Sequence, residues 1–281
     1  MPESRWLHDR LTLTGLMIVS SFLVLAIAAP VIAPYNPAGI DPAHRLEGIS
    51  SAHIFGTDNL GRDLFSRMAY GARWSLGAAA LATAAIVCIG VVVGTAAGYK
   101  GGRTGDVLMR TVDVVLAFPS LLLALAIAGT LGPGIGSVMV GLVSVGWAAY
   151  ARVVRGMVLE LRERDFVAAA RALGASDRYI VTRHIIPNVL PAITVLATVE
   201  MGELILALAG FGFLGVGIQP PTPEWGAMIN DARPFVLDAP ALVVVPGIAI
   251  GLLVGGFNLL GDGLRDALDP RSAPVRETPP G

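Results

Sequence analysis

Charged residues are scarce in this sequence. Only 15% of its 281 residues are Asp, Glu, Lys or Arg, and 54% are hydrophobic, whereas about 25% of residues are charged in an average soluble domain. The formal net charge of −1 provides no basic field that would attract nucleic acid. The composition therefore excludes an ordinary soluble domain and predicts an integral membrane protein that lies in the lipid bilayer.

Residues that bind metals or act as nucleophiles are also few. The one cysteine, Cys88, lies in an apolar run, and the four histidines are scattered without an H-E-x-x-H pair. Neither a G-x4-G-K-S/T phosphate loop nor a G-x-S-x-G elbow occurs. We expect no metal site, no cofactor and no catalysis in this chain, so that energy for any transport must come from a partner.

Six apolar stretches approach the roughly 20 residues that a helix needs to cross a bilayer. They cover residues 13–33, 75–98, 114–131, 135–154, 189–217 and 241–260. The sequence thus predicts an all-α membrane protein with six transmembrane helices. The first stretch has an alternative interpretation as a signal peptide, because Arg5 and Arg10 precede it and Ala26-Ile27-Ala28 resembles a cleavage site.

The basic residues predict the orientation, because Lys and Arg in short loops stay cytoplasmic. With the N-terminus inside, the inside segments hold 15 of the 20 basic residues. Four of the other five lie in the first outside loop, where Asp and Glu residues offset them. Both termini are therefore expected in the cytoplasm.

Two apolar stretches carry glycines four residues apart, which places them on one face of a helix and lets a neighbouring helix approach closely. These are Gly90, Gly94 and Gly98 in the second stretch, and Gly247, Gly251 and Gly255 in the sixth. The alternative is the ordinary abundance of glycine in this chain. Pro119 and Pro246 each remove a helical hydrogen bond and are expected to bend or loosen their helices.

Two acidic residues interrupt the fifth stretch. Glu200 and Glu203 are three residues apart and so share nearly one helix face. Because a charge at mid-bilayer costs about 2.5 to 3.5 kcal/mol on insertion scales, such residues normally face a bundle interior or a watery path. We expect both to line a translocation route. The alternative is that they lie shallow in the membrane or are protonated.

The segment between the fourth and fifth stretches contains two short predicted helices. Asp165 is expected to cap the first, Gly174 to end it in the left-handed conformation, Ser176 to cap the second and Pro187 to close it. Phe166, Ala169, Ala170 and Leu173 then form a small apolar face. This face buries too little area for a membrane anchor, which favours a contact with another protein.

Four sequence motifs resemble those of permease subunits of ATP-binding-cassette importers. Ala169-Ala170, Gly174 and Ile185-Ile186-Pro187 have the spacing of the family's EAA loop, with Ala168 where the consensus has Glu. The segments 56–63 (GTDNLGRD), 213–226 (FLGVGIQPPTPEWG) and 260–270 (LGDGLRDALDP) resemble the dipeptide, oligopeptide and nickel branch, and specifically its C-type permease. The resemblance covers nearly the whole chain.

The resemblance implies a type I importer permease with the MetI-like fold. It implies a heterodimer with a second permease, two ATPase domains that bind ATP and Mg, and an external substrate-binding protein. Residues 166–175 would then be the coupling helix, which contacts an ATPase through Phe166, Ala169, Ala170, Arg171, Leu173, Gly174 and Ala175. Gln219, Pro220 and Trp225 are candidates for an outer gate or a binding-protein contact, although a plain interfacial turn is the alternative.

The expected organisation follows from these assignments. It comprises an N-terminal tail (1–12), the first span (13–33), an external loop (34–74), a core of five spans (75–262) with a coupling loop at 159–187, and a C-terminal tail (263–281). The location is a bacterial or archaeal plasma membrane, and the expected substrate is a di- or oligopeptide. The alternatives are import of nickel or another metal chelate by the same machinery, an ion-coupled secondary transporter, and an intramembrane enzyme.

Overall fold

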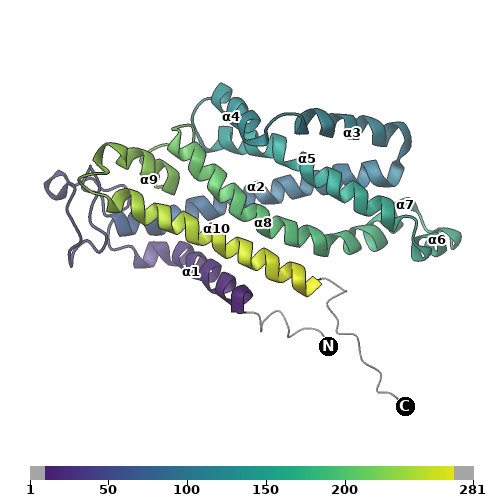
Figure 1. Ribbon diagram of the computed structural model, residues 1–281, viewed down its shortest axis with the longest axis horizontal. Helices are drawn as coiled ribbons and strands as arrows, with labels where there is room; N and C mark the ends of the chain where they lie inside the picture. The colour runs from purple at the N-terminus through teal and green to yellow at the C-terminus, as the bar shows by residue number, and fades with distance from the viewer. Residues whose placement is uncertain (1–9, 269–281) are drawn as a thin grey trace, which may run out of the picture.

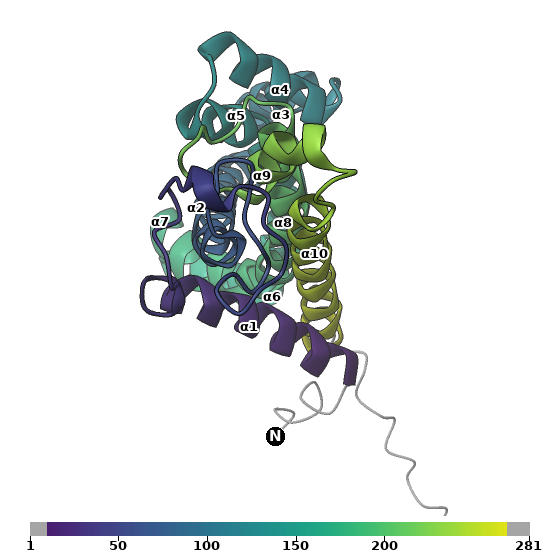
Figure 2. The same cartoon turned by 90° about the vertical axis from the view of Figure 1, so that its left-hand side faces the viewer.

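The computed structural model describes residues 10–268, which are almost entirely helical. Among them, five helices are long and apolar enough to cross a membrane. They are α1 (Arg10–Ile32), α2 (Leu64–Lys100), α5 (Ile135–Leu161), the continuous helix Asp177–Phe213 and α10 (Ala241–Leu268). α1 lies along α10 at one edge of the molecule, and α3 and α4 lie at the opposite edge (Figures 1 and 2).

The third predicted span is broken rather than straight. α3 (Gly102–Leu116) and α4 (Ser120–Leu131) meet at an angle of 85°. Pro119 directly precedes α4, and because proline has no N–H to donate, the helix breaks beside it. The expected bend at Pro119 is confirmed, and the described residues hold six spans if this bent pair crosses the membrane as one unit.

Two helix boundaries also differ from the predicted ones. α2 begins at Leu64, well before residue 75, because the Asp63 carboxylate accepts a hydrogen bond from Ser66 N and caps the helix. The segment expected as a loop up to residue 74 is thus partly helical. α10 continues to Leu268, past the predicted end of the core at residue 262. Residues 1–9 and 269–281 of the predicted tails lie outside the described residues.

Pro187 does not end a helix, contrary to the prediction. α7 (Asp177–Ile180) continues through a π-helical turn, η3 (Val181–Ile185), into α8 (Ile186–Phe213). The Ile186 N–H bonds to Val181 O, five residues back, and this wider turn accommodates a proline that cannot donate. Pro246 likewise lies inside a continuous helix, α10.

The two glycine stripes have different surroundings. On α2, a side chain added at Gly94 would meet Ala151 O at 2.6 Å, and one at Gly98 would meet Val158 Cβ at 2.8 Å. A side chain added at Gly90 would lie closer still to Tyr150 Cβ. This stripe therefore sets the close approach of α2 and α5.

The α10 stripe has no such neighbour among the described residues. At Gly247, Gly251 and Gly255 nothing lies within 4 Å of an added Cβ. No helix of the described residues packs on this stripe, so its role in helix packing stays a prediction, and within the chain the adjacent Gly256 provides the close approach. An added Cβ at Gly15 of α1 would lie 2.8 Å from Gly256 O.

Short elements gather at the two ends of the helix bundle. Residues 34–63, with η2 (Pro42–His44), lie at one end with α9 (Trp225–Ala232) and η4 (Arg233–Phe235) (Figure 1). We refer to residues 34–63 and α9 together as the cap. At the other end lie α6 (Asp165–Ala172) and α7, which we call the α6–α7 segment (residues 165–180).

Candidate functional site

A cavity of about 540 Å³ lies among α2, α4, α5 and α8. Its walls are apolar, with side chains such as Ile86, Leu125 and Phe211, and the polar lining residues are Ser120, Glu200 and Glu203. This volume falls within the 300–1,000 Å³ typical of small-molecule sites. The cavity is therefore large enough for a small substrate.

Glu200 and Glu203 project into this cavity from near the middle of α8. Glu200 is half-buried and Glu203 is exposed. Within residues 10–268 neither carboxylate forms an ion pair or a hydrogen bond. The structure thus brings the two predicted pathway residues to one cavity, where no charged partner from residues 10–268 contacts them.

The α6 helix turns an apolar face outward. Leu173 is 88% exposed and Phe166 is 41% exposed, and Ala169 is also exposed, as is Arg171. The opposite face holds α6 to the bundle through Val167, which is fully buried. Ala170 and Ala175, expected to contact a partner, are instead half-buried against the core. The available contact surface is therefore narrower than the sequence suggested.

Local hydrogen bonds give the α6–α7 segment its shape. Gly174 has φ +81°, which confirms the predicted left-handed turn, and Ser176 caps α7 as predicted. Asp165 was expected to cap α6, but it is the first helical residue and Arg164 occupies the cap position without a side-chain bond. Tyr99 at the end of α2 donates a hydrogen bond to Asp177 Oδ1 at 2.7 Å. This bond links the segment directly to α2.

The connection between α8 and α9 contains the predicted gate residues. Gln219 and Pro220 are exposed, and Gln219 Nε2 donates to Gly217 O at 2.9 Å. Trp225 is fully buried: its Nε1 donates to Met68 O at 3.2 Å and its ring packs edge-on against Phe22. Trp225 is therefore not available as a surface contact, contrary to the expectation, and it holds α9 against α1 and α2.

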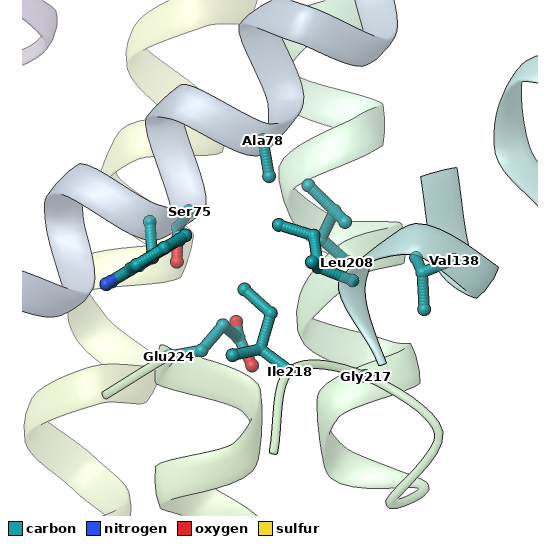
Figure 3. Close-up of a pocket in the computed structure, with 9 residues that line it drawn as sticks. Ser75, Ala78, Val138, Leu208, Gly217, Ile218 and Glu224 are labelled. Atoms are coloured by element: carbon teal, nitrogen blue, oxygen red, sulfur yellow. The ribbon is translucent and has the colours of Figure 1, made fainter. Parts of the chain in front are cut away.

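Glu224, which the sequence did not single out, lines a small cavity together with Trp74 and Ser75 of α2. The cavity measures about 10 Å³, roughly the space of one water. Glu224 and Ile218 face Ser75 and Ala78 of α2 across it (Figure 3). Burial raises the pKa of Glu224, while hydrogen bonds that its carboxylate accepts from Gly226 N and Ala227 N oppose that rise. Glu224 thus caps α9.

Buried ion pairs hold the cap together, and sequence reasoning missed their role. Arg62 Nε lies 2.6 Å from Asp58 Oδ2, Arg67 Nε lies 3.4 Å from the same atom, and Arg62 Nη2 lies 3.7 Å from Asp231 Oδ2. His53 Nδ1 lies 2.9 Å from Asp63 Oδ1. The GTDNLGRD segment was the available signal, because it supplies Asp58, Arg62 and Asp63, half of these side chains. The charged side chains of this segment hold α2 and α9 to the loop of residues 34–63.

These features define a class of protein: a helical membrane transport subunit with a central cavity and an apolar helix presented at one end. The chain belongs to the family described as the binding-protein-dependent transport system inner membrane component, whose model matches residues 90–274. A second model, the N-terminal TM domain of oligopeptide transport permease C, matches residues 4–48. The resemblance stated from the motifs is confirmed.

Two relatives illustrate the similarity across the chain. The dipeptide transport system permease protein DppC of Alkalihalophilus pseudofirmus is 44% identical over 263 residues, covering 94% of this chain and 86% of the relative. The glutathione transport system permease protein GsiD of Escherichia coli O6:K15:H31 is 44% identical over 268 residues, covering 95% and 88%. The chain therefore spans most of the length of both permeases.

Solved structures agree with the predicted fold. A chain from an inward-facing MetNI methionine ABC transporter matches with a TM-score of 0.56 at 21% identity, covering 72% of this chain and 97% of that chain. A second crystal form of the same transporter matches with a TM-score of 0.53 at 19% identity. The chain thus has the fold of an importer permease.

Proposed function

We propose that the chain is a non-catalytic permease subunit of an ATP-binding-cassette importer for di- or oligopeptides. The relatives named as dipeptide and glutathione permeases support this substrate class. In this proposal the chain forms half of the translocation pathway in the plasma membrane of a bacterium or archaeon. A second permease subunit supplies the other half.

The observation that carries the proposal is the outward apolar face of α6. Phe166 and Leu173 are large, apolar and exposed, while Val167 beneath them is buried. For such a helix, burial of the apolar face in a cleft of an ATPase domain is more favourable than exposure of that face to water. Because the sequence has no phosphate loop, two partner ATPase domains would bind ATP and Mg and supply the energy.

The remaining features fit the same scheme. Displacement of α6 would pass to α2 through the Tyr99–Asp177 hydrogen bond and to α8 through the continuous helix from Asp177. An external binding protein would meet the opposite end, where Gln219 and Pro220 are exposed. In this proposal the α6–α7 segment and both chain termini lie in the cytoplasm.

A pair of exposed leucines tests the proposal. The chain is expressed with its partner subunits, extracted in mild detergent and purified as Leu173→Glu or as the matched control Leu237→Glu, since Leu237 is 94% exposed near the cap. We expect Leu173→Glu to lose the ATPases and ATP-driven dipeptide uptake, and Leu237→Glu to retain the ATPases. ATPases that remain bound to Leu173→Glu would contradict the coupling role.

The same preparation separates the competing functions. Parent complex reconstituted with its binding protein should take up a dipeptide only with ATP. Uptake driven by an ion gradient without nucleotide would contradict the importer proposal and indicate a secondary transporter. Uptake of a nickel chelate in preference to the dipeptide would support an ATP-driven importer and contradict the proposed peptide substrate.

A further inference from the structure

A second large cavity, of about 550 Å³, lies between α1, α2 and α5, toward the end of the bundle that carries the cap. Pro30 lies in the last turn of α1, and Ile135 is the first residue of α5. Both residues line the cavity, so it lies at the level where these two spans end. In a bilayer the ends of the spans lie among the lipid headgroups. The cavity is therefore placed where headgroups meet the protein.

Three hydrogen-bond donors of α2 form the polar side of this cavity. Arg73 is exposed and forms no ion pair within residues 10–268, and no side chain that lines the cavity is acidic. Neither the Tyr70 hydroxyl nor the Trp74 indole N–H forms a hydrogen bond in that part of the chain. The indole N–H groups of Trp147 and Trp225, by contrast, donate to backbone oxygens. The cavity therefore offers a ligand one positive charge and two further donors.

The rest of the cavity wall is apolar. Gly77 and Leu81 follow along α2, and Met139 contributes from α5. Leu81 is 64% exposed, and nothing lies within 4 Å of a Cβ added at Gly77, so the described residues leave this wall uncovered. Leu81 lies eight residues beyond Arg73, which is roughly 12 Å along the helix toward the middle of the membrane. The cavity is thus polar at the level of the headgroups and apolar below it.

This change of polarity along the cavity fits a phospholipid better than a small anion or an uncharged apolar molecule. Phosphate oxygens accept charge-assisted hydrogen bonds from arginine, and Tyr and Trp side chains are enriched at the level of the headgroups. An acyl chain would cover the apolar wall at Leu81 and Met139. A free phosphate ion would leave that wall exposed, whereas an uncharged apolar molecule would leave Arg73 without an opposite charge.

We propose that this cavity binds one anionic phospholipid, with its phosphate at Arg73 and Trp74 and an acyl chain along Leu81. A net negative headgroup is favoured over a zwitterionic one, because the ammonium group of a zwitterionic headgroup already neutralises the phosphate. The lipid contacts α1, α2 and α5 together, so that it holds the first span to the core. The site does not depend on the importer function proposed above, and only its assignment to the outer leaflet uses the proposed orientation.

The test measures lipid binding to the permease complex, purified in mild detergent and washed free of native lipid. Phosphatidylglycerol is titrated into the parent and into Arg73→Gln, and native mass spectrometry counts the molecules bound. We expect the tightest site to bind about ten-fold more weakly in the variant, because a charge-assisted hydrogen bond is lost. Phosphatidylglycerol with brominated acyl chains gives the location, because bromine quenches nearby tryptophan. The fluorescence quenched at the tightest site should be the component that is absent from Trp74→Phe.

Matched controls separate a specific site from a general attraction of lipid to basic residues. Arg10, the first residue of α1, is also exposed and does not line the cavity, so Arg10→Gln should leave the affinity unchanged. Phosphatidylethanolamine, which has the chains and the phosphate but no net charge, should bind more weakly than phosphatidylglycerol. Glycerol phosphate, without chains, and dioctanoylglycerol, without phosphate, should not displace phosphatidylglycerol at equal concentrations.

Each contrary result would overturn the site. Equal weakening by Arg73→Gln and Arg10→Gln would show only a general attraction to basic residues. Displacement by glycerol phosphate would indicate a site for free anions, and displacement by dioctanoylglycerol would indicate an apolar cleft without a role for the phosphate. Absence of bound phosphatidylglycerol from the parent complex would show that another subunit covers the cavity. If Arg73→Gln does not assemble, we expect Tyr70→Phe and Trp74→Phe to weaken binding about three-fold, and unchanged affinity in both would overturn the site.

Discussion

The two ends of the helix bundle use their side chains in opposite ways. In the cap, charged residues are buried: Arg62 and Arg67 are each 3% exposed, and they pair with Asp58. In the α6–α7 segment an apolar residue is exposed instead, with Leu173 at 88%. The buried ion pairs of the cap hold an irregular loop to its helices. The exposed apolar face of the α6–α7 segment would become buried only on contact with a partner, so that its burial can contribute to binding. The side chains of the cap therefore stabilise this chain itself, whereas those of the α6–α7 segment are available to contact a partner.

The largest expected effect comes from removing a buried charge in the cap. Arg62→Met leaves Asp231 without its arginine partner and Asp58 with Arg67 alone, and breaking a buried pair in this way costs about 3 kcal/mol or more. Thermal unfolding of the purified complex in detergent measures the loss. Arg178→Met in the α6–α7 segment, where the arginine is exposed, should change stability by less than about 0.5 kcal/mol. Equal losses of stability for the two variants would contradict the proposed difference between the cap and the α6–α7 segment.

A smaller difference is expected between two helix caps. Glu224 accepts hydrogen bonds from Gly226 N and Ala227 N at 2.9 and 2.8 Å in a buried setting, whereas Ser176 accepts one from Tyr179 N at 3.4 Å in an exposed setting. Loss of a cap costs about 0.5 to 2 kcal/mol. We expect Glu224→Ala near the upper value and Ser176→Ala near the lower. Chemical denaturation of the two variants, compared with the parent, measures both.

The cap should also respond to pH. Burial raises the pKa of Glu224 above 4.5 and that of Asp231 above 3.8. A carboxyl with a raised pKa binds its proton more tightly when folded, so its contribution to stability is present at low pH and is lost as the pH rises through the folded pKa. We therefore expect unfolding temperatures to fall as the pH rises through the raised pKa values of these two carboxyls, and Glu224→Gln to flatten that slope. An unchanged slope in Glu224→Gln would assign the effect to other groups.

The difference between the cap and the α6–α7 segment could be predicted only partly from the sequence. Helix-forming stretches, the left-handed Gly174 and the Ser176 cap follow from local chemistry, and the structure confirms them. Which way a short helix turns its faces is a tertiary property. Ala170 and Ala175 belong to the same predicted contact set as Leu173, yet they lie half-buried against the core.

Spacing alone also could not decide what each glycine stripe contacts. Gly94 and Gly251 occupy equivalent positions in two identical patterns, but within residues 10–268 Gly94 packs against another helix and Gly251 does not. Prolines were similarly ambiguous, because Pro119 lies at a break whereas Pro187 is absorbed by a π-helical turn. One ion pair of the cap, between Arg62 and Asp231, joins residues far apart in sequence. Long-range packing, which no local pattern encodes, decided each of these cases.

The smallest effect on stability, and the sharpest separation of stability from function, is expected at Leu173. Because this side chain is 88% exposed, Leu173→Ala should change the free energy of unfolding by less than about 0.5 kcal/mol. Its apolar surface would be buried only in the complex, so the same substitution should weaken ATPase binding by about ten-fold. Thermal unfolding and a titration of ATPase against the permease pair measure the two quantities. A variant that loses stability and binding together would show that Leu173 supports the α6–α7 segment itself, and the exposed face would then have no separate role in contact.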